Sequence, residues 1–367
     1  MDLDKKYIKI AIFLLKKIIG TTFPNPPVVS LIVESNSKKK FNKIVSFGYT
    51  FEGGRPHAEA VALRKVTFKK KHHYTLYSTL EPCCHSGRDE SCVSKILKSK
   101  INRVVFSLRD PDKRVNGSGE KLLRTSGLEV LGDILNKETK QIYDGYILNR
   151  KFRRPKITLK IGSSIDTKIT SKLNKSEKIT NDQVKKIVHI MRSEADAILV
   201  GKNTVNIDNP KLNCRIEGLK RFSPIRIILS KKLDLNLHSH IFKNCKINRT
   251  FIFTIKNESQ IIKKIQKKKV KVFMLDKKMF KLSNIIKELA KLGVCNLLVE
   301  GGGEVFTSFL DEELVDRLII FRSNYFIGGT GVNAINLLNK KKKITFKPTQ
   351  LSIVKNNTME ILEKQNY

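Results

Sequence analysis

The residues of this chain that could do chemistry gather between positions 57 and 92. His57 and Glu59 stand at the start of this stretch, and Cys83 and Cys92 follow near its end. One imidazole and two thiolates form a good ligand set for Zn²⁺, and a catalytic zinc site keeps a fourth position for water. Zinc lowers the pKa of such a water to about 7, and a nearby carboxylate can then carry its protons. The spacing therefore favours a catalytic zinc site with a carboxylate beside it.

The segments around these residues suit a metal site better than a buried core. A lone His-Ala-Glu is common, and a free cysteine is most often a small buried hydrophobic residue. Here, however, the alternating run at 74–80 predicts a strand that delivers Cys83 at its end. The segment 84–91 between the two cysteines is polar and turn-rich, as a metal loop requires. The turn at 53–56 predicts a helix that begins near His57, which would hold that ligand firmly.

The motif resembles that of the zinc-dependent nucleoside and nucleobase deaminases, which carry H-x-E followed by P-C. This resemblance implies that His57, Cys83 and Cys92 are the zinc ligands. It also implies that Glu59 is the catalytic general acid and base.

The spacing of the two cysteines narrows the resemblance further. Most of these deaminases close the motif with C-x-x-C, whereas eight residues separate Cys83 from Cys92 here. This longer spacing, together with His85, Gly87 and Arg88, is similar to the deaminase half of the bifunctional riboflavin-biosynthesis deaminase–reductases. That family resemblance predicts a second domain downstream.

The length and composition of the chain limit which classes of protein it can belong to. A length of 367 residues predicts two domains, and a hydrophobic content of 40% fits a globular protein. No apolar run reaches the length of a membrane span, and the N-terminal run suits an amphipathic helix over residues 4–19 better than a signal peptide. Three of the six cysteines lie in one metal loop, which indicates a reducing compartment. We therefore expect a cytoplasmic protein with no membrane association.

The formal net charge of +38 is the most unusual feature of the composition. Such a charge can indicate a nucleic-acid partner. The basic residues are nevertheless scattered in short runs, such as Lys69–Lys71 and Lys267–Lys269, and no nucleic-acid-binding module accompanies them. We therefore expect a solvated basic surface and no nucleic-acid partner. The same field would attract anionic, phosphorylated substrates.

The first domain is expected over residues 1–148, and it alternates strands with helices. Strands are predicted at 28–33, 44–49, 74–80 and 103–106, and a helix at 93–99. This alternation favours an α/β/α layered fold, and the resemblance implies a cytidine-deaminase-like one. The rigid turn around Asn25 resembles the family's substrate-binding P-N-P motif, which implies that Asn25 meets the pyrimidine. The resemblance likewise places His85 at the substrate.

The second domain is expected over residues 149–367, after a basic segment that ends in Pro155. A strand at 157–161 that runs into a small-residue turn is similar to the start of the family's reductase domain, which has a dihydrofolate-reductase-like α/β fold. The resemblance places the cofactor against Gly162, Thr204 and Asp208. It places the substrate's ribose phosphate near Ser176, Arg192, Leu212 and Arg215. The two arginines suit this role, because a guanidinium group binds phosphate oxygens in pairs.

Two further strand ends complete the expected reductase site. A strand at 225–229 ends at Ser230, where ligands of α/β proteins commonly bind. A second apolar strand ends in Glu300 and turns through Gly301, Gly302 and Gly303 into a helix. Glycines in such a turn let backbone N–H groups approach a phosphate at the helix start. The turn matches the family's V-E-G-G motif, which implies contacts from these glycines and Thr307 to the cofactor and from Glu300 to the substrate.

By this resemblance the chain is identified as a member of the bifunctional deaminase–reductase family. The first domain would then deaminate 2,5-diamino-6-ribosylamino-4(3H)-pyrimidinone 5′-phosphate by hydrolysis. The second would reduce its ribosyl group to ribityl, giving 5-amino-6-ribitylaminouracil 5′-phosphate. The implied cofactors are Zn²⁺ and NADPH, and the implied partners are this phosphorylated ribosylaminopyrimidine and further copies of the chain in a homodimer or higher homo-oligomer.

Three alternatives stay open. The first is a tRNA or nucleotide deaminase with an unrelated second domain, which predicts a C-x-x-C motif and no NADPH domain. The second is a homologue in which one activity has decayed, prompted by Val29 and by Asp89–Ser91, which depart from the family's pattern. The third is a nucleic-acid-binding module, which would show salt-dependent binding.

Overall fold

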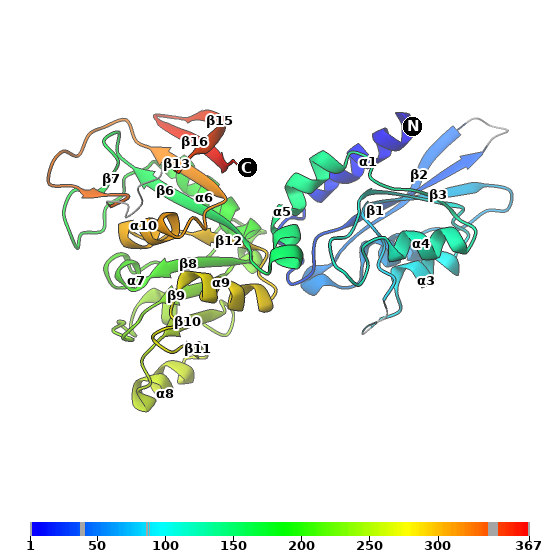
Figure 1. Cartoon of the computed structure of the whole chain (residues 1–367). Coiled ribbons are helices and arrows are strands. Elements are labelled where there is room, and N and C mark those ends of the chain that lie inside the picture. The colour runs from blue at the N-terminus through cyan, green and yellow to red at the C-terminus, as the bar shows by residue number, and fades with distance from the viewer. Residues whose placement is uncertain (1, 37–40, 86, 88, 337–343, 366–367) are drawn as a thin grey trace. The chain divides into compact units, whose positions relative to one another are not determined.

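The computed structural model describes residues 2–36, 41–85, 87, 89–336 and 344–365. The chain divides into two compact units, Met1–Arg153 and Arg154–Tyr367 (Figure 1). The first unit extends beyond residue 148 because its last helix continues to Phe152. Arg153 then ends this helix in the left-handed backbone conformation, with φ of 53°.

The N-terminal unit is built on one five-stranded sheet. Its strands are β1 (Val29–Asn36), β2 (Phe41–Tyr49), β3 (His73–Leu80), β4 (Arg103–Leu108) and β5 (Glu129–Leu131). Its helices are α1 (Asp2–Leu15), α2 (Ala58–Arg64), α3 (Cys92–Leu97), α4 (Ser118–Thr125) and α5 (Asn136–Phe152), with a short 3₁₀ helix η1 (Glu52–Gly54). The strand order is β2-β1-β3-β4-β5. The first three strands pair antiparallel, and β3, β4 and β5 pair parallel.

Helices cover both faces of this sheet, which gives the predicted α/β/α layers (Figure 1). On one face, a buried apolar cluster joins α2, α3 and α4 to the strands through residues such as Ala62, Ile96, Leu123, Leu76 and Phe106. The opposite face carries α1 and α5. The ring of Tyr7 in α1 packs 5.0 Å from that of Tyr77 in β3, and Tyr143 of α5 hydrogen-bonds Thr79 at 2.9 Å. Successive side chains of β3 point to opposite faces of the sheet, so this strand packs against the helices of both layers.

Helix α1 is shorter than the predicted helix over residues 4–19. It ends at Leu15, and the chain then tightens into turns closed by bonds from the amides of Lys17 and Ile18 to the carbonyls three residues before them. Gly20 follows with φ of 77°. The apolar pattern continues past the helix because Ile18 remains partly buried in the turn.

The C-terminal unit is built on a nine-stranded sheet of order β11-β10-β9-β8-β12-β6-β13-β16-β15. Its strands are β6 (Lys156–Ser163), β8 (Ala197–Gly201), β9 (Ile225–Leu229), β10 (Thr250–Thr254), β11 (Lys271–Met274), β12 (Asn296–Val299), β13 (Arg317–Arg322), β15 (Phe346–Val354) and β16 (Asn357–Lys364), while β7 (Lys168–Thr170) and β14 (Val332–Asn333) form a separate pair. Its helices are α6 (Asp182–Glu194), α7 (Lys202–Asp208), α8 (Ser259–Lys267), α9 (Leu282–Lys291) and α10 (Gly303–Asp311), with 3₁₀ helices η2 (Lys220–Phe222) and η3 (His240–Phe242).

The middle strands of this sheet are parallel, and this arrangement creates the ligand-binding edge. Strands β11, β10, β9, β8, β12, β6 and β13 pair parallel in that order. Their carboxyl ends therefore meet at one edge, where open α/β sheets bind ligands. Helix α7 begins directly after β8, and α10 begins after β12 and the three residues 300–302, so the N-termini of both helices lie at this edge.

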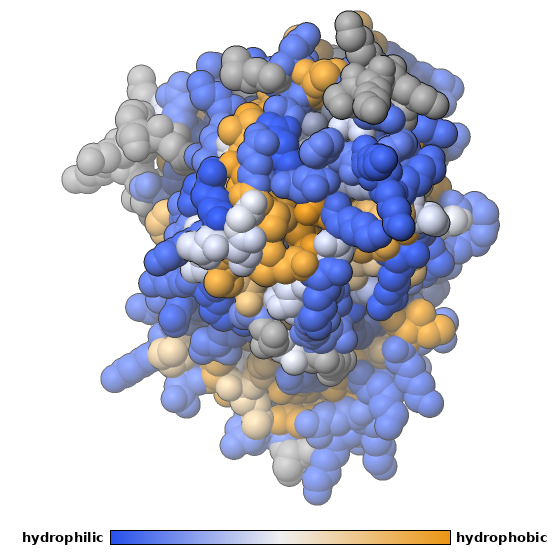
Figure 2. Space-filling model, turned by 90° about the vertical axis from the view of Figure 1, so that its right-hand side faces the viewer, coloured by the Kyte–Doolittle hydropathy of each residue, from blue (hydrophilic) through white to orange (hydrophobic). Residues whose placement is uncertain are grey.

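The surface is dominated by hydrophilic side chains on the face that Figure 2 shows, with a smaller apolar area near its centre. The exposed large apolar residues of the N-terminal unit include Phe47, Tyr49 and Phe51, on and just after the edge strand β2. No helix among the described residues is long and apolar enough to cross a membrane.

Candidate active sites

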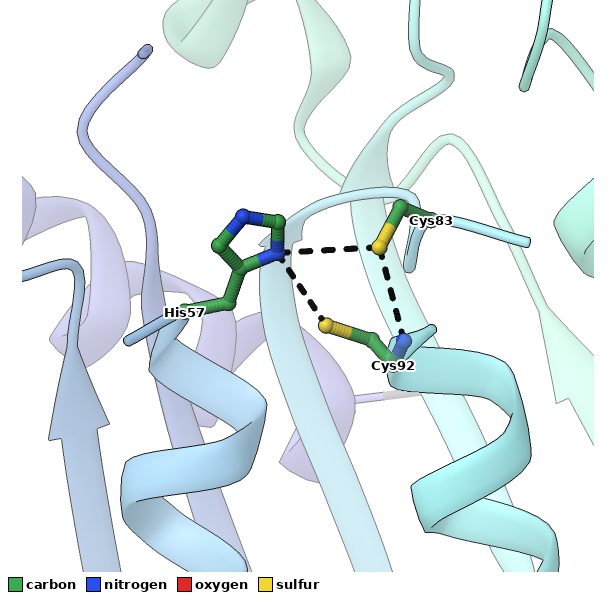
Figure 3. A group of neighbouring side chains, drawn as sticks. All are labelled: His57, Cys83 and Cys92. Carbon is green, nitrogen blue, oxygen red and sulfur yellow. Dashed lines mark hydrogen bonds between the residues drawn. The ribbon is translucent and has the colours of Figure 1, made fainter. Parts of the chain in front are cut away.

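The three predicted zinc ligands converge at one point of the N-terminal unit. The Nδ1 atom of His57 lies 3.6 Å from the Sγ of Cys83 and 3.4 Å from the Sγ of Cys92. All three ligand atoms lie within 4.8 Å of one another (Figure 3). One imidazole nitrogen and two sulfurs at this separation fit a tetrahedral Zn²⁺ that keeps one position open.

Helix starts and a strand end hold these ligands. His57 immediately precedes α2, and Cys92 is the first residue of α3. The side chain of Ser91 caps α3 by accepting a bond of 3.1 Å from the amide of Ser94. Cys83 lies three residues beyond β3, where its sulfur accepts a bond of 3.4 Å from the amide of Cys92.

The two thiols differ in their affinity for protons. Hydrogen bonding from Cys92, aided by His57 and opposed by burial, lowers the pKa of Cys83 to about 4. The pKa of Cys92 is raised, because hydrogen bonding with Cys83 and burial both disfavour its thiolate. Zinc binding requires both thiolates, so loading the site releases the proton of Cys92.

Glu59 lies beside the ligand cluster without belonging to it. The residue is 3% exposed. Its Oε2 atom accepts from the thiol of Cys92 at 3.3 Å, and its Oε1 atom accepts from the hydroxyl of Ser78 at 3.3 Å. Burial raises the pKa of this carboxyl. A buried carboxyl fixed beside a metal site can accept a proton and return it to a leaving group.

A cavity of about 210 Å³ opens over Glu59 and the cluster. The predicted substrate-binding residues Asn25 and His85 both line it. The amide of Asn25 donates to the carbonyl of Gly54 at 3.0 Å, which fixes its orientation. The Nδ1 atom of His85 is buried and has no hydrogen-bond partner among the described residues. Such an unsatisfied atom at a cavity wall suits a polar ligand.

The structure adds cavity residues that the sequence analysis did not name as site residues. Further lining residues are Thr50, Arg55, Leu80, Glu81, Asp110, Asp112, Arg114, Val115, Tyr146 and Arg150. The carboxylate of Glu81 accepts three backbone bonds of 3.0–3.2 Å from the segment 110–120, which pins this loop over the cavity. The hydroxyl of Tyr146 donates to Asp110 at 3.0 Å, and burial raises the pKa of Asp110 to about 6. Tyr146 comes from α5, and no local motif marks it.

The positions that depart from the family's pattern leave the described part of the site intact. Val29 is 1% exposed and packs in the core, and its neighbour Val28 lines the cavity instead. Asp89 forms an ion pair with Arg55, and Ser91 caps the helix that carries Cys92. Arg88, part of the family resemblance, lies outside the described residues.

The C-terminal unit has its own cavity, of about 910 Å³, at the carboxyl ends of the parallel strands. Eight predicted site residues line it, namely Gly162, Ser176, Thr204, Asp208, Glu300, Gly301, Gly302 and Gly303. A Cβ atom on Gly301 would lie 2.6 Å from that of Val305, so the turn cannot carry a side chain there. The cavity lies at the upper end of the range for ligand sites, about 300–1,000 Å³. The start of α10 suits a phosphate of a dinucleotide, and the residues present therefore fit NADPH.

A cluster of ionised side chains forms one wall of this cavity. The carboxylate of Glu300 accepts from Arg192 through Nε at 2.8 Å and Nη2 at 2.9 Å, and the Nζ of Lys160 lies 3.4 Å away. Burial acts to raise the pKa of Glu300, but Arg192 and Lys160 outweigh it and lower the pKa to about 2. The sequence analysis did not name Lys160, although a lysine within the apolar strand at 157–161 was a signal for it.

The other five predicted residues do not line the cavity. Arg192 holds Glu300 with the guanidinium fork that was expected to bind phosphate. Arg215 is exposed and donates to Asn213 at 3.1 Å, and Leu212 is 2% exposed in the core. Ser230 is 1% exposed, and the hydroxyl of Thr307 donates to the carbonyl of Gly303 at 2.7 Å. Their contacts to cofactor or substrate stay predictions.

Comparison with known families defines the class of this protein. The family described as the cytidine and deoxycytidylate deaminase zinc-binding region matches residues 1–108, and the RibD C-terminal domain matches residues 155–358. A zinc-binding deaminase domain followed by this reductase domain makes the chain a bifunctional deaminase–reductase, with Zn²⁺ and NADPH as its cofactors. The predicted fold class, a cytidine-deaminase-like domain and a dihydrofolate-reductase-like domain, is confirmed.

The chain belongs to the RibD family of riboflavin biosynthesis proteins. It is 38% identical over 351 residues to the riboflavin biosynthesis protein RibD of Aquifex aeolicus, covering 94% of this chain and 95% of that protein. It is 34% identical over 340 residues to the RibD of Buchnera aphidicola, covering 89% and 88%. The solved structure of a diaminohydroxyphosphoribosylaminopyrimidine deaminase/5-amino-6-(5-phosphoribosylamino)uracil reductase from Thermotoga maritima matches with a TM-score of 0.84 at 29% identity, over 99% of each chain. These matches exclude a nucleotide deaminase with an unrelated second domain.

Proposed function

We propose that the N-terminal unit deaminates 2,5-diamino-6-ribosylamino-4(3H)-pyrimidinone 5′-phosphate and that the C-terminal unit then reduces the ribosyl group of the product. The observation that carries the first step is the position of Glu59, a buried carboxyl at the His57–Cys83–Cys92 cluster, beneath a cavity. The family of the chain and the name of the Thermotoga maritima structure support this substrate class.

In the deamination step, Zn²⁺ held by His57, Cys83 and Cys92 would supply an activated water. Glu59 takes a proton from that water and delivers one to the departing amine, while Ser78 holds its carboxylate in place. The side chain of Asn25, oriented by Gly54, and the unsatisfied Nδ1 atom of His85 orient the pyrimidine ring. The small cavity limits the water that reaches the ring.

In the reduction step, NADPH would supply a hydride to C1′ of the sugar. The turn Gly301–Gly303 and the start of α10 hold its phosphates, and the hydroxyl of Thr204 lies beside this turn, 3.9 Å from the position that a Cβ on Gly302 would take. Glu300 and Lys160 lie at the same cavity, where they can orient the ribosyl group and its phosphate. Arg192 keeps Glu300 ionised and fixed, which makes it a positioning residue.

The test supplies the diaminopyrimidinone phosphate to the purified chain with and without NADPH, and follows ammonia release and NADPH oxidation separately. We expect ammonia release without NADPH, and NADPH oxidation only after deamination. Absence of ammonia release from zinc-loaded protein would contradict the deaminase assignment.

The variant Glu59→Gln separates the two sites. It should retain zinc and lose ammonia release by a factor of at least about 10²–10⁴, the usual contribution of a general acid and base. It should still oxidise NADPH when given the deaminated intermediate. Loss of both activities together would contradict two independent sites.

We also propose that the chain acts in the cytoplasm as a homodimer or higher homo-oligomer. Its free cysteines suit a reducing compartment, since all six are thiols. Light scattering on the purified chain would test the assembly, and a monomer at micromolar concentration would contradict it.

A further inference from the structure

Helix α5 carries two buried tyrosines on one of its sides. Tyr143 is 1% exposed and Tyr146 is 7% exposed. Residues three positions apart lie on the same side of a helix, and the centres of these two rings are 6.4 Å apart. This side faces the sheet, because the hydroxyl of Tyr143 bonds that of Thr79 in β3. We call the two residues the tyrosine pair.

The first tyrosine anchors one segment of the wall of the deaminase cavity. The hydroxyl of Tyr143 donates to the carbonyl of Pro27 at 2.6 Å. Because a tyrosine hydroxyl has one hydrogen, the bond of 2.9 Å between Tyr143 and Thr79 is donated by the threonine. The Oγ1 atom of Thr79 in turn accepts from the amide of Val29 at 3.1 Å. This chain of three bonds holds the backbone on both sides of Val28, which lines the cavity.

The second tyrosine anchors another segment of the same wall. The hydroxyl of Tyr146 donates to the Oδ1 atom of Asp110 at 3.0 Å, and the amide of Asp112 donates to the same atom at 2.8 Å. Both bonds end on Oδ1, which leaves the Oδ2 atom of Asp110 available to a ligand in the cavity that this residue lines. The guanidinium group of Arg150 lies 5.0 Å from the centre of the Tyr146 ring and helps to fix it.

We propose that the tyrosine pair positions the two wall segments 25–28 and 110–112, which contact the pyrimidine ring, and so sets the affinity of the deaminase for its substrate. The inference rests on the deamination proposed above. Both tyrosines act through other residues, because no hydrogen bond of their hydroxyls ends on Glu59 or on a zinc ligand among the described residues. Loss of either hydroxyl should therefore weaken substrate binding and leave the chemical step intact.

The test compares KM and kcat for ammonia release from the diaminopyrimidinone phosphate by the zinc-loaded, full-length chain. The variants Tyr143→Phe and Tyr146→Phe each remove one hydroxyl and keep the ring. We expect KM to rise about three- to tenfold in each variant, the factor that corresponds to one net hydrogen bond, while kcat and zinc content stay unchanged. NADPH oxidation with the deaminated intermediate should also stay at the wild-type rate.

A matched pair of variants at Thr79 tests the chain of bonds from its other side. Thr79→Val keeps the shape of the side chain without its hydroxyl, so it should raise KM as Tyr143→Phe does. Thr79→Ser keeps the hydroxyl and should keep the wild-type KM. Tyr7→Phe is the control, because Tyr7 is also buried but donates to the carbonyl of Asn42 at 3.5 Å, in the edge strand β2. Its KM should equal that of the wild type.

An unchanged KM in either variant of the tyrosine pair would overturn the inference while leaving the deaminase assignment in place. A loss of zinc and of kcat without a rise in KM would do the same, because it would show a purely structural role. A Thr79→Ser variant as impaired as Thr79→Val would also count against the chain of bonds. Absence of ammonia release from zinc-loaded wild-type protein would instead overturn the proposed deamination, and the inference with it.

Discussion

The ion cluster around Glu300 allows a quantitative prediction for the variant Glu300→Gln. The side chain of Glu300 is 6% exposed, and those of Arg192 and Lys160 are 12% and 19% exposed. The substitution keeps the shape of the residue and removes its charge, so two largely buried cations face each other without a carboxylate. Breaking a buried ion pair on one side costs about 3–5 kcal/mol.

The pKa of Glu300 gives a similar magnitude. A fall from its ordinary value of 4.5 to about 2 corresponds to a stabilisation of about 3 kcal/mol, at about 1.36 kcal/mol per pKa unit. For a unit of this size, about 1 kcal/mol shifts the melting temperature by about 2–4 °C. We therefore expect Glu300→Gln to melt about 6–12 °C below the wild type in its C-terminal unit.

The pH dependence follows from the direction of the shift. Because the pKa of Glu300 is lower in the folded chain, its contribution is complete above about pH 4.5 and is lost as the pH falls towards about 2. Calorimetric melting curves without nucleotide should show a constant difference between variant and wild type at pH 6–8, and a smaller one below about pH 4.5.

A matched control lies at the start of α10. Glu304 is exposed, and Glu304→Gln should shift the melting temperature by about 2 °C at most. A melting temperature of Glu300→Gln within about 1 °C of the wild type would refute the reasoning, because the carboxylate would then not hold the two cations.

Two further predictions concern the N-terminal unit. Gly54→Ala should raise the KM for deamination, because the new Cβ atom would lie 2.5 Å from the Cβ of Asn25 at a backbone φ of 83°. Gly53→Ala is the control, because the backbone φ there is 73° and no atom lies within 4 Å of the position that its Cβ would take. Equal kinetics of the two variants would speak against a role for Asn25. Removal of zinc with a chelator should abolish ammonia release, but the protein should still oxidise NADPH when it is given the deaminated intermediate. The variant Cys92→Ser should have a lower zinc content, measured by atomic absorption. Full ammonia release from metal-free protein would contradict the zinc assignment.

The sequence alone determined the family and the fold class, and it named the three residues that converge as a possible metal site. The cluster of His57, Cys83 and Cys92 could be predicted because each ligand stands at the end of a strand or the start of a helix. The turn Gly301–Gly303 carries a comparable local signal, an apolar strand followed directly by glycines. These signals come from residues that are adjacent in the chain, so a single sequence is enough to show them.

Only the tertiary structure decided which distant residues share a wall of each cavity. Tyr146 reaches the deaminase cavity from α5, and Glu81 fastens the loop at 110–120. Arg192 was expected to offer its guanidinium fork to a phosphate, but Glu300, 108 positions away, holds the fork in the folded chain. In the C-terminal unit, the strand order β8-β12-β6 brings the ends of these strands, and so Glu300 and Arg192, together. The order of the strands in a sheet depends on how the whole unit packs, and it cannot be read from the local periodicity of the sequence.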